Sequence, residues 1–303
     1  MARLLEPIRL RVAASALGPF AHAPYPLDST LEHDGDAGLF GPGAVSWHVI
    51  ADPAAFVGGI RGLLIQAAHP EVVAGVGDHS RYRDDPLGRL SRTSAYITAT
   101  TFGARPEVEA AVAQVERIHR RVKGVSSRGI EYDASTPSYA AWVHNVLTDS
   151  FLTAHQMFGG RRLTIEEMDR FVVEQTRVGA LLGADPMPET ANDLRRWIEA
   201  HPDIEASHEM EDAVRFLTDP PLDPTTKAGY KVLMEAAAAT IPLRIRDILG
   251  IGKTGLAIPV GRAAVGALRW ALGYSPSWEL ALRRSGAPVP EGMFKRLIPS
   301  AGV

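Results

Sequence analysis

The chain has 303 residues, of which 46% are hydrophobic and 22% charged, and its formal net charge of −3 does not favour nucleic acid as a partner. The absence of cysteine excludes disulfides, thiolate zinc sites, iron–sulfur clusters and a cysteine nucleophile. The length is sufficient for one large domain that buries a cofactor cavity.

The N-terminal segment, residues 1–45, is expected to be an irregular arm. Glycine and proline interrupt it repeatedly, above all at 34–38 and 41–43. Residues 1–11 are too charged, and their apolar run is too short, for a secretory signal. Together with the missing cysteines, this favours a cytoplasmic protein.

Helical patterns follow in chain order. Asp52 is a good N-cap with Pro53 in the first helical position, and the helix that they begin reaches Pro70. Thr164 and Glu167 form a capping box for a helix that extends to residue 182. The remaining helices are expected at 87–101, 106–122, 137–158, 188–197, 208–217, 225–240 and 242–249.

Strand patterns are essentially missing, because alternating β-branched runs bounded by turns do not occur. The sequence therefore predicts an all-α fold of about ten helices in a single domain. Its parts are the arm at 1–45, a helical body at 46–250 and a helical extension at 251–303 packed on the same domain. A helical sandwich of this size can enclose a planar cofactor between facing helices.

The C-terminal extension contains the longest apolar segment, residues 254–268. Pro259, Gly261 and Arg262 interrupt it, and it falls short of the roughly 18 apolar residues of a membrane span. A core helix is the favoured interpretation, and peripheral contact with a membrane surface is the alternative. The tail around Trp270 and Trp278 suits a dimer or a membrane surface equally, so no oligomeric state is predicted.

Two short motifs do not carry the functions that they suggest. Gly252, Lys253 and Thr254 match the end of a P-loop, but Asp247 stands where the pattern needs glycine and no strand precedes it. His208 lacks a second histidine at metalloprotease spacing. Neither a nucleotide site nor a metalloprotease is expected.

His119 is the first candidate for a cofactor ligand. Apolar residues recur at helical spacing around it, at Val108, Ala111, Val112, Val115, Ile118 and Val122. His119 lies on this stripe, so its ring is expected to face a helical core, either hydrogen-bonded there or bound to something. With ten histidines and no cysteine, the chain must use nitrogen and oxygen ligands if it holds iron. His144 lies on the inward stripe of 137–158 and is either a pocket residue or an ordinary core histidine.

Arg89, Arg92 and Thr93 have i, i+3, i+4 spacing and are predicted to share one helix face. Two guanidinium groups and a hydroxyl can bind carboxylates or polarise a bound oxygen species. The alternative is a solvated basic face whose arginines pair with Asp84 or Asp85.

Four segments carry a family resemblance: LLIQAAHP (63–70), DHSRYRDDPLGRLSRT (78–93), IHRRVKG (118–124) and WVHNVLTDSF (142–151). Together they resemble the latex clearing protein (rubber oxygenase) and MpaB-like oxygenase superfamily, over about residues 40–250. The most specific pieces are the Arg-x-x-Arg-Thr run and the Ile-His-x-x-Val helix.

The resemblance implies an all-helical fold with a globin-like core that binds haem b. Latex-clearing members cleave double bonds of polyisoprene with dioxygen, and MpaB-like members oxidatively cleave a terpenoid side chain. By this resemblance His119 matches the proximal iron ligand, and Arg89, Arg92 and Thr93 match a run on the distal side. If haem binds, Arg89 and Arg92 would hold the propionates or stabilise an iron–oxygen intermediate, and His144 would either line the pocket or be an ordinary core histidine.

One departure concerns Arg92, which stands where the latex enzymes carry lysine. Lysine can become neutral and coordinate iron, whereas arginine stays charged, so a lysine-capped resting state is not expected. Glu71 is nearest by spacing to the acid that the latex enzymes use as a base. Nothing in the sequence identifies polyisoprene as the substrate.

The leading hypothesis is a cytoplasmic haem b oxygenase that uses dioxygen on a small hydrophobic molecule such as an alkene or terpenoid. His119 would ligate the iron, and Arg89, Arg92 and Thr93 would shape the oxygen pocket. Membrane association through the C-terminal tail accompanies this hypothesis. One alternative is a non-oxygenase haem protein, which would be a sensor, a carrier or a peroxidase-like catalyst. Another is a helical binding protein without a cofactor.

Overall fold

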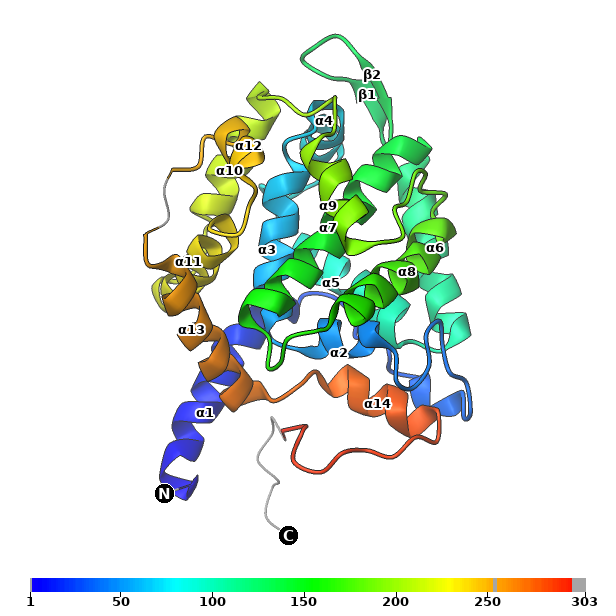
Figure 1. Ribbon diagram of the computed structural model, residues 1–303, viewed down its shortest axis with the longest axis vertical. Helices are drawn as coiled ribbons and strands as arrows, with labels where there is room; N and C mark the ends of the chain where they lie inside the picture. The colour runs from blue at the N-terminus through cyan, green and yellow to red at the C-terminus, as the bar shows by residue number, and fades with distance from the viewer. Residues whose placement is uncertain (1, 253–254, 296–303) are drawn as a thin grey trace.

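The computed structural model describes residues 2–252 and 255–295 of the chain (Figure 1). The described residues form fourteen α-helices, two short 3-10 helices and one two-stranded hairpin, which confirms the all-α prediction. The α-helices are α1 (Ala2–Leu17), α2 (Val45–Ala51), α3 (Ala54–Gln66), α4 (Pro70–His79), α5 (Pro86–Phe102), α6 (Arg105–His119), α7 (Pro137–Phe158), α8 (Ile165–Leu181), α9 (Ala191–Glu199), α10 (His208–Thr218), α11 (Pro224–Ala238), α12 (Leu243–Ile248), α13 (Ala257–Leu272) and α14 (Pro276–Arg284). The other elements are η1 (Gly18–Phe20), η2 (Thr30–Glu32), β1 (Lys123–Val125) and β2 (Glu131–Asp133). Lys253 and Thr254, which complete the P-loop-like pattern, lie outside the described residues.

The long helices begin close to the predicted positions, and their caps explain why. The capping box of α8 is confirmed, because the Glu167 amide donates to Thr164 Oγ1 at 3.2 Å and the Thr164 amide donates to Glu167 Oε2 at 3.0 Å. Asp52 accepts the amide N–H of Ala54 at 2.8 Å, but the helix starts at Ala54, one residue later than predicted. The helix number exceeds ten partly because neither α1 nor the seven-residue α2 was predicted as a helix.

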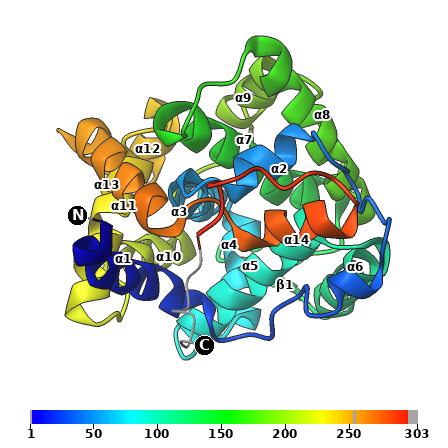
Figure 2. The same cartoon turned by 90° about the horizontal axis from the view of Figure 1, so that it is seen from below.

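The expectation of a fully irregular N-terminal arm is wrong for residues 2–17, which form α1. This helix packs beside α13, at the other end of the chain, and Ala13 is buried there (Figures 1 and 2). Packing against a distant helix stabilises α1, which its own sequence pattern does not predict.

The hairpin of β1 and β2 is a second difference from the sequence-based expectation. The strands pair antiparallel, with Lys123 opposite Asp133, and Gly129 adopts a positive φ of 77° in the connection. Three-residue strands are too short to show an alternating pattern. Tyr132 is buried at the base of the hairpin, where its hydroxyl donates to Asp78 Oδ2 at 2.5 Å.

The centre of the molecule is the pair α3 and α7, which run side by side (Figure 1). Two glycines of α3 allow the two helices to approach closely, because they have no side chain at the contact. A Cβ atom on Gly58 would lie 2.7 Å from Phe151 Cδ1, and one on Gly62 would lie 2.7 Å from Leu147 Cδ2. Any larger side chain at either position would push the two central helices apart.

A buried ion pair crosses the same interface. Arg61 Nη1 lies 2.7 Å from Asp149 Oδ2, and the two side chains are only 2% and 3% exposed. Arg61 Nη1 also donates to Ser150 Oγ at 2.8 Å. Each charge is therefore compensated inside the core, and loss of one partner would leave the other as a buried charge without a counterion.

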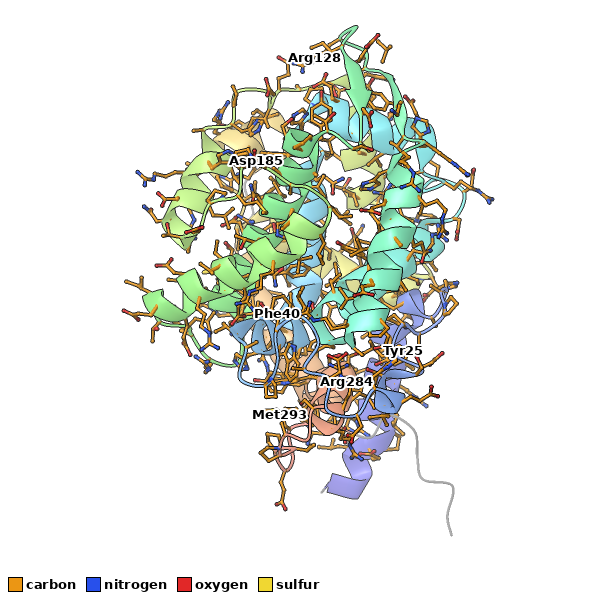
Figure 3. The ribbon with its side chains drawn as sticks, turned by 90° about the vertical axis from the view of Figure 1, so that its right-hand side faces the viewer. Tyr25, Phe40, Arg128, Asp185, Arg284 and Met293 are labelled. Carbon is orange, nitrogen blue, oxygen red and sulfur yellow. The ribbon has the colours of Figure 1, made fainter. Side chains whose placement is uncertain are left out.

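The C-terminal helices fold back onto the body. Helix α13 packs against α11 and α1, and α14 packs against η2, α5 and α2 (Figure 2). Arg284 of α14 is buried, and its guanidinium donates to Thr30 Oγ1 and to the Phe102 carbonyl, both at 2.6 Å (Figure 3). The last helix is thus anchored to the N-terminal arm and to the end of α5.

The apolar C-terminal segment forms an amphipathic helix. Val265 and Leu272 of α13 are buried, whereas Leu256 (77%), Val260 (47%) and Trp270 (44%) are exposed. Among the residues that the structure describes, no single helix has both the length and the apolar character of a bilayer span. Helices α2 and α3 meet these criteria only as a pair, with a bend of 89° between them.

Candidate functional site

A cavity of about 820 Å³ lies among α1, α3, α5, α11 and α13. Its wall is mainly apolar and aromatic, with Phe20, Phe56, Ile60, Leu90, Ile97 and Leu233 among the lining side chains. The rings of Phe20 and Phe56 pack with their centroids 5.4 Å apart. Cavities of this volume and character accept small hydrophobic molecules.

Helix α5 places Arg89 and Thr93 on the cavity wall. The helix starts at Pro86, and Asp85 caps it by accepting the Gly88 amide N–H at 3.0 Å. Positions 89 and 93 are one turn apart, so both face the same side. Burial lowers the pKa of Arg89, and within the described parts of the chain its guanidinium has neither an acidic partner nor a hydrogen-bond acceptor. A charged group therefore faces an apolar cavity without a counterion.

Arg92 is not brought into this cavity lining. Its side chain is 49% exposed, and its Nη1 lies 3.1 Å from Asp85 Oδ2. This is the ion pair that the alternative interpretation of the basic run anticipated. The role of Arg92 in catalysis stays a prediction.

His119 is the last residue of α6, and its side chain is half-buried. The buried stripe of this helix is shorter than predicted, because Val108 and Val112 are buried but Ile118 is 51% exposed. Burial lowers the pKa of His119, so the ring is neutral at pH 7. Its ring nitrogens have no hydrogen-bond partner in residues 2–252 or 255–295, but the cavity lining does not include this residue.

His144 lies where α7 faces α8, also outside the cavity lining. A Cβ atom on Gly179 of α8 would lie 2.8 Å from His144 Cδ2, so the ring fills the space that this glycine leaves. Burial lowers the pKa of His144 to about 4, which keeps the ring uncharged. The structure therefore separates His144 from Arg89 and Thr93, and its pocket role stays a prediction.

The nearby carboxylates are already engaged. Asp52 reaches the cavity wall, but its Oδ1 lies 2.7 Å from Arg269 Nη2 and its Oδ2 accepts the Gly160 amide N–H at 3.0 Å. Glu71 lies outside the lining and is held by Arg128 at 2.5 Å and by Ser126 Oγ at 2.9 Å. Neither carboxylate is free to act as a base in this arrangement.

Several polar residues were not predicted as site residues from the sequence. The Tyr96 hydroxyl on α5 is buried without a partner, and burial raises its pKa. His69, His201 and Asp203 lie close enough together to hold a metal ion. A helical pattern gives no signal for such a group, because two of its members lie on a connection distant in sequence from the third.

The arrangement can bind a hydrophobic molecule and place its reacting part beside Arg89 and Thr93. A cation and a hydroxyl one helical turn apart on an apolar wall can stabilise negative charge that develops on oxygen. The apolar wall strengthens this effect because it excludes water. The cavity chemistry therefore suits reactions in which oxygen gains charge on an apolar substrate.

Comparisons with known proteins give one match. The family model described as "ER-bound oxygenase mpaB/B'/Rubber oxygenase, catalytic domain" matches residues 47–270. The match includes α5, α6, α7 and most of α13, and so covers most of the cavity wall. No curated protein and no solved structure matches the chain.

Proposed function

Because the chain belongs to the family of mpaB-type and rubber-oxygenase catalytic domains, an oxygenase family, we propose that it adds dioxygen to a hydrophobic alkene or terpenoid bound in the α5 cavity. The proposal includes haem b as the cofactor, with His119 as its iron ligand. The observation that carries the proposal is the large apolar cavity with Arg89 unpaired on its wall beside Thr93.

His119 has the protonation state and the available ring nitrogens that a haem ligand needs. The ring is neutral because burial lowers its pKa, and its nitrogens are not taken by other described residues. A neutral imidazole on a helix is a common proximal ligand when oxygen binds opposite. His119 lies on α6, which packs against α5, but it stands apart from the α5 cavity. The proposal therefore requires that haem held by His119 reach the α5 cavity from α6.

Haem, when bound, would supply the iron that activates dioxygen. The residues of the chain would orient the substrate, exclude water and stabilise developing charge. The apolar wall orients the substrate and excludes water, which increases the strength of nearby charges. Arg89 keeps its charge near pH 7 in spite of its lowered pKa, and its guanidinium stabilises oxygen atoms that gain negative charge. The Thr93 hydroxyl, one turn away, donates a second hydrogen bond to the same region.

The function is tested by supplying labelled dioxygen and a panel of terpenoid alkenes, with the saturated analogue of each as control. Cleavage of one double bond by one dioxygen gives two carbonyls, so electrons balance without a reductant. We expect label in both carbonyl products and none with the saturated analogues. A protein that consumes peroxide but never labels an alkene would instead be a non-oxygenase haem protein.

Arg89→Ala is expected to lower kcat by about 10²–10³-fold, because it removes the charge that stabilises the developing oxyanion. Thr93→Val is expected to have a smaller effect of the same kind. Arg92→Ala is the matched control: its side chain pairs with Asp85 outside the cavity, so activity should fall less than about tenfold. Oxygen consumption at saturating substrate gives the comparison. Equal losses in Arg89→Ala and Arg92→Ala would restore both arginines to the oxygen pocket.

The exposed apolar face of α13 supports a second part of the proposal, peripheral contact with a membrane. Leu256, Val260 and Trp270 lie on this face, and inward residues of α1 and α13 line the cavity. A hydrophobic substrate would enter from the lipid between these helices. The description of the matched family model names an ER-bound oxygenase, mpaB/B', which supports this part of the proposal.

Substitution of Trp270 by Glu tests the membrane contact by co-sedimentation with phospholipid vesicles. We expect most of the vesicle binding to be lost, because a charge replaces an aromatic side chain at the lipid surface. Leu31→Glu is the control, since Leu31 is 54% exposed on η2, away from α13. If neither variant changes sedimentation, this face does not bind membranes.

A further inference from the structure

Two histidines and one aspartate meet at one end of the central helix α3. One ring nitrogen of His69, one of His201 and a carboxylate oxygen of Asp203 all lie within 4.8 Å of one another. His69 stands at the N-cap of α4, and the other two lie on the connection between α9 and α10. None of the three lines the α5 cavity, so the group is separate from the proposed oxygenase site.

Aromatic rings enclose the two histidines. The His69 ring lies 5.2 Å from the ring of Tyr139, and the His201 ring lies 4.8 Å from those of both Trp142 and Trp197. His69 is 2% exposed and His201 is 8% exposed, whereas Asp203 is exposed. The imidazoles are therefore held rigidly away from water, and the carboxylate can adjust its position from the open side.

The histidines are in the chemical state that a metal ion requires. Burial lowers the pKa of His69 to about 4 and also lowers that of His201, so both rings are neutral at pH 7. His69 Nδ1 is buried without a hydrogen-bond partner and lies 3.5 Å from Glu71 Oε2. A carboxylate behind an imidazole is the arrangement that orients metal-binding histidines. Arg128, at the hairpin, holds Glu71 in this place (Figure 3).

We propose that His69, His201 and Asp203 bind one divalent transition-metal ion of the zinc and iron class. Two imidazoles and one carboxylate are a ligand set that Zn²⁺ and Fe²⁺ both accept, with water completing the coordination on the exposed side. Calcium and magnesium are disfavoured, because they prefer oxygen ligands.

The ion would clamp the connection between α9 and α10 to the end of α3. In the structure this connection is held by the Glu205 amide, which donates to the Ala68 carbonyl at 3.1 Å, and by Arg244, which donates to the His201 carbonyl at 3.2 Å. The Asp203 amide donates to His201 Nδ1 at 3.3 Å, a long bond that a metal ion can replace. Metal binding would therefore add a cross-link between this connection and the start of α4.

The test is isothermal titration of the full chain with Zn²⁺ after treatment with EDTA and dialysis. We expect one zinc ion per chain and a higher Tm in its presence. Asp203→Asn should weaken zinc binding by roughly 10–100-fold, and His201→Ala should abolish it. Asp203 is exposed, so the asparagine variant is expected to fold normally. Haem content, measured separately, should not change in Asp203→Asn.

The control is a pair on α10, in which Nε2 of the exposed His208 lies 4.0 Å from Oδ2 of the partly buried Asp212. The variants His208→Ala and Asp212→Asn remove the same types of side chain without touching the cluster, and should bind zinc like the wild type. No stoichiometric zinc uptake by the wild type, or equal affinity in the wild type and Asp203→Asn, would overturn the proposal. The two histidines would then be ordinary core residues stacked among aromatic rings.

Discussion

His119→Ala is expected to purify nearly colourless, whereas the wild type expressed with haem precursor carries a Soret band that shifts on reduction and again with carbon monoxide. Haem b is not covalently attached, so removal of its axial imidazole removes the bond that retains it. The half-buried position of His119 at the end of α6 means that the fold should survive the substitution. The pyridine haemochrome assay gives haem per chain, and circular dichroism checks that helix content is unchanged.

Two comparisons make the result specific to His119. His208→Ala removes a histidine that is 78% exposed and should keep full colour. Added imidazole should restore haem binding to His119→Ala, because it can occupy the space that the side chain leaves. Full haem retention in His119→Ala would reject this residue as the ligand. Loss of iron in His201→Ala without loss in His119→Ala would instead place the iron at the metal cluster beside α4.

Arg61→Met is expected to lower the free energy of unfolding by about 3–5 kcal/mol, because it strands a buried carboxylate. Asp149, its partner, is 3% exposed and lies 2.7 Å from Arg61 Nη1 in the wild type. The pair spans α3 and α7, the two helices at the centre of the fold. Urea denaturation followed by circular dichroism measures the change.

The double variant Arg61→Met with Asp149→Leu is the control for this prediction. It removes both charges together, so it should be clearly more stable than Arg61→Met alone. If the double variant loses the sum of the two single losses, the two side chains are not coupled across the interface. Arg89→Ala provides a contrast, because Arg89 has no acidic partner in the described chain and its loss should cost activity rather than stability.

Periodic patterns predicted the main helices because each one buries a single face against the core. Local hydrogen bonds also set helix starts: the capping box of Thr164 and Glu167 begins α8 at the predicted position. The all-α class follows from the same local information. The family match to residues 47–270 agrees with the motifs read from the chain.

The sequence pattern did not predict elements that are stabilised by contacts with distant segments of the chain. Helix α1 is held by α13, and the hairpin at 123–133 is held by Tyr132 against Asp78 of α4. Ile118 is 51% exposed although it continues the apolar spacing of α6.

The sequence by itself determined the helical class, the positions of the long helices and the residues that could serve an oxygenase. Only the tertiary structure separated Arg92, paired with Asp85 in solvent, from Arg89 and Thr93 on the cavity wall. It also brought His69 next to His201, which no spacing rule connects. The physical reason is that helical periodicity records which face is buried, whereas the partner of a buried side chain depends on how distant helices pack.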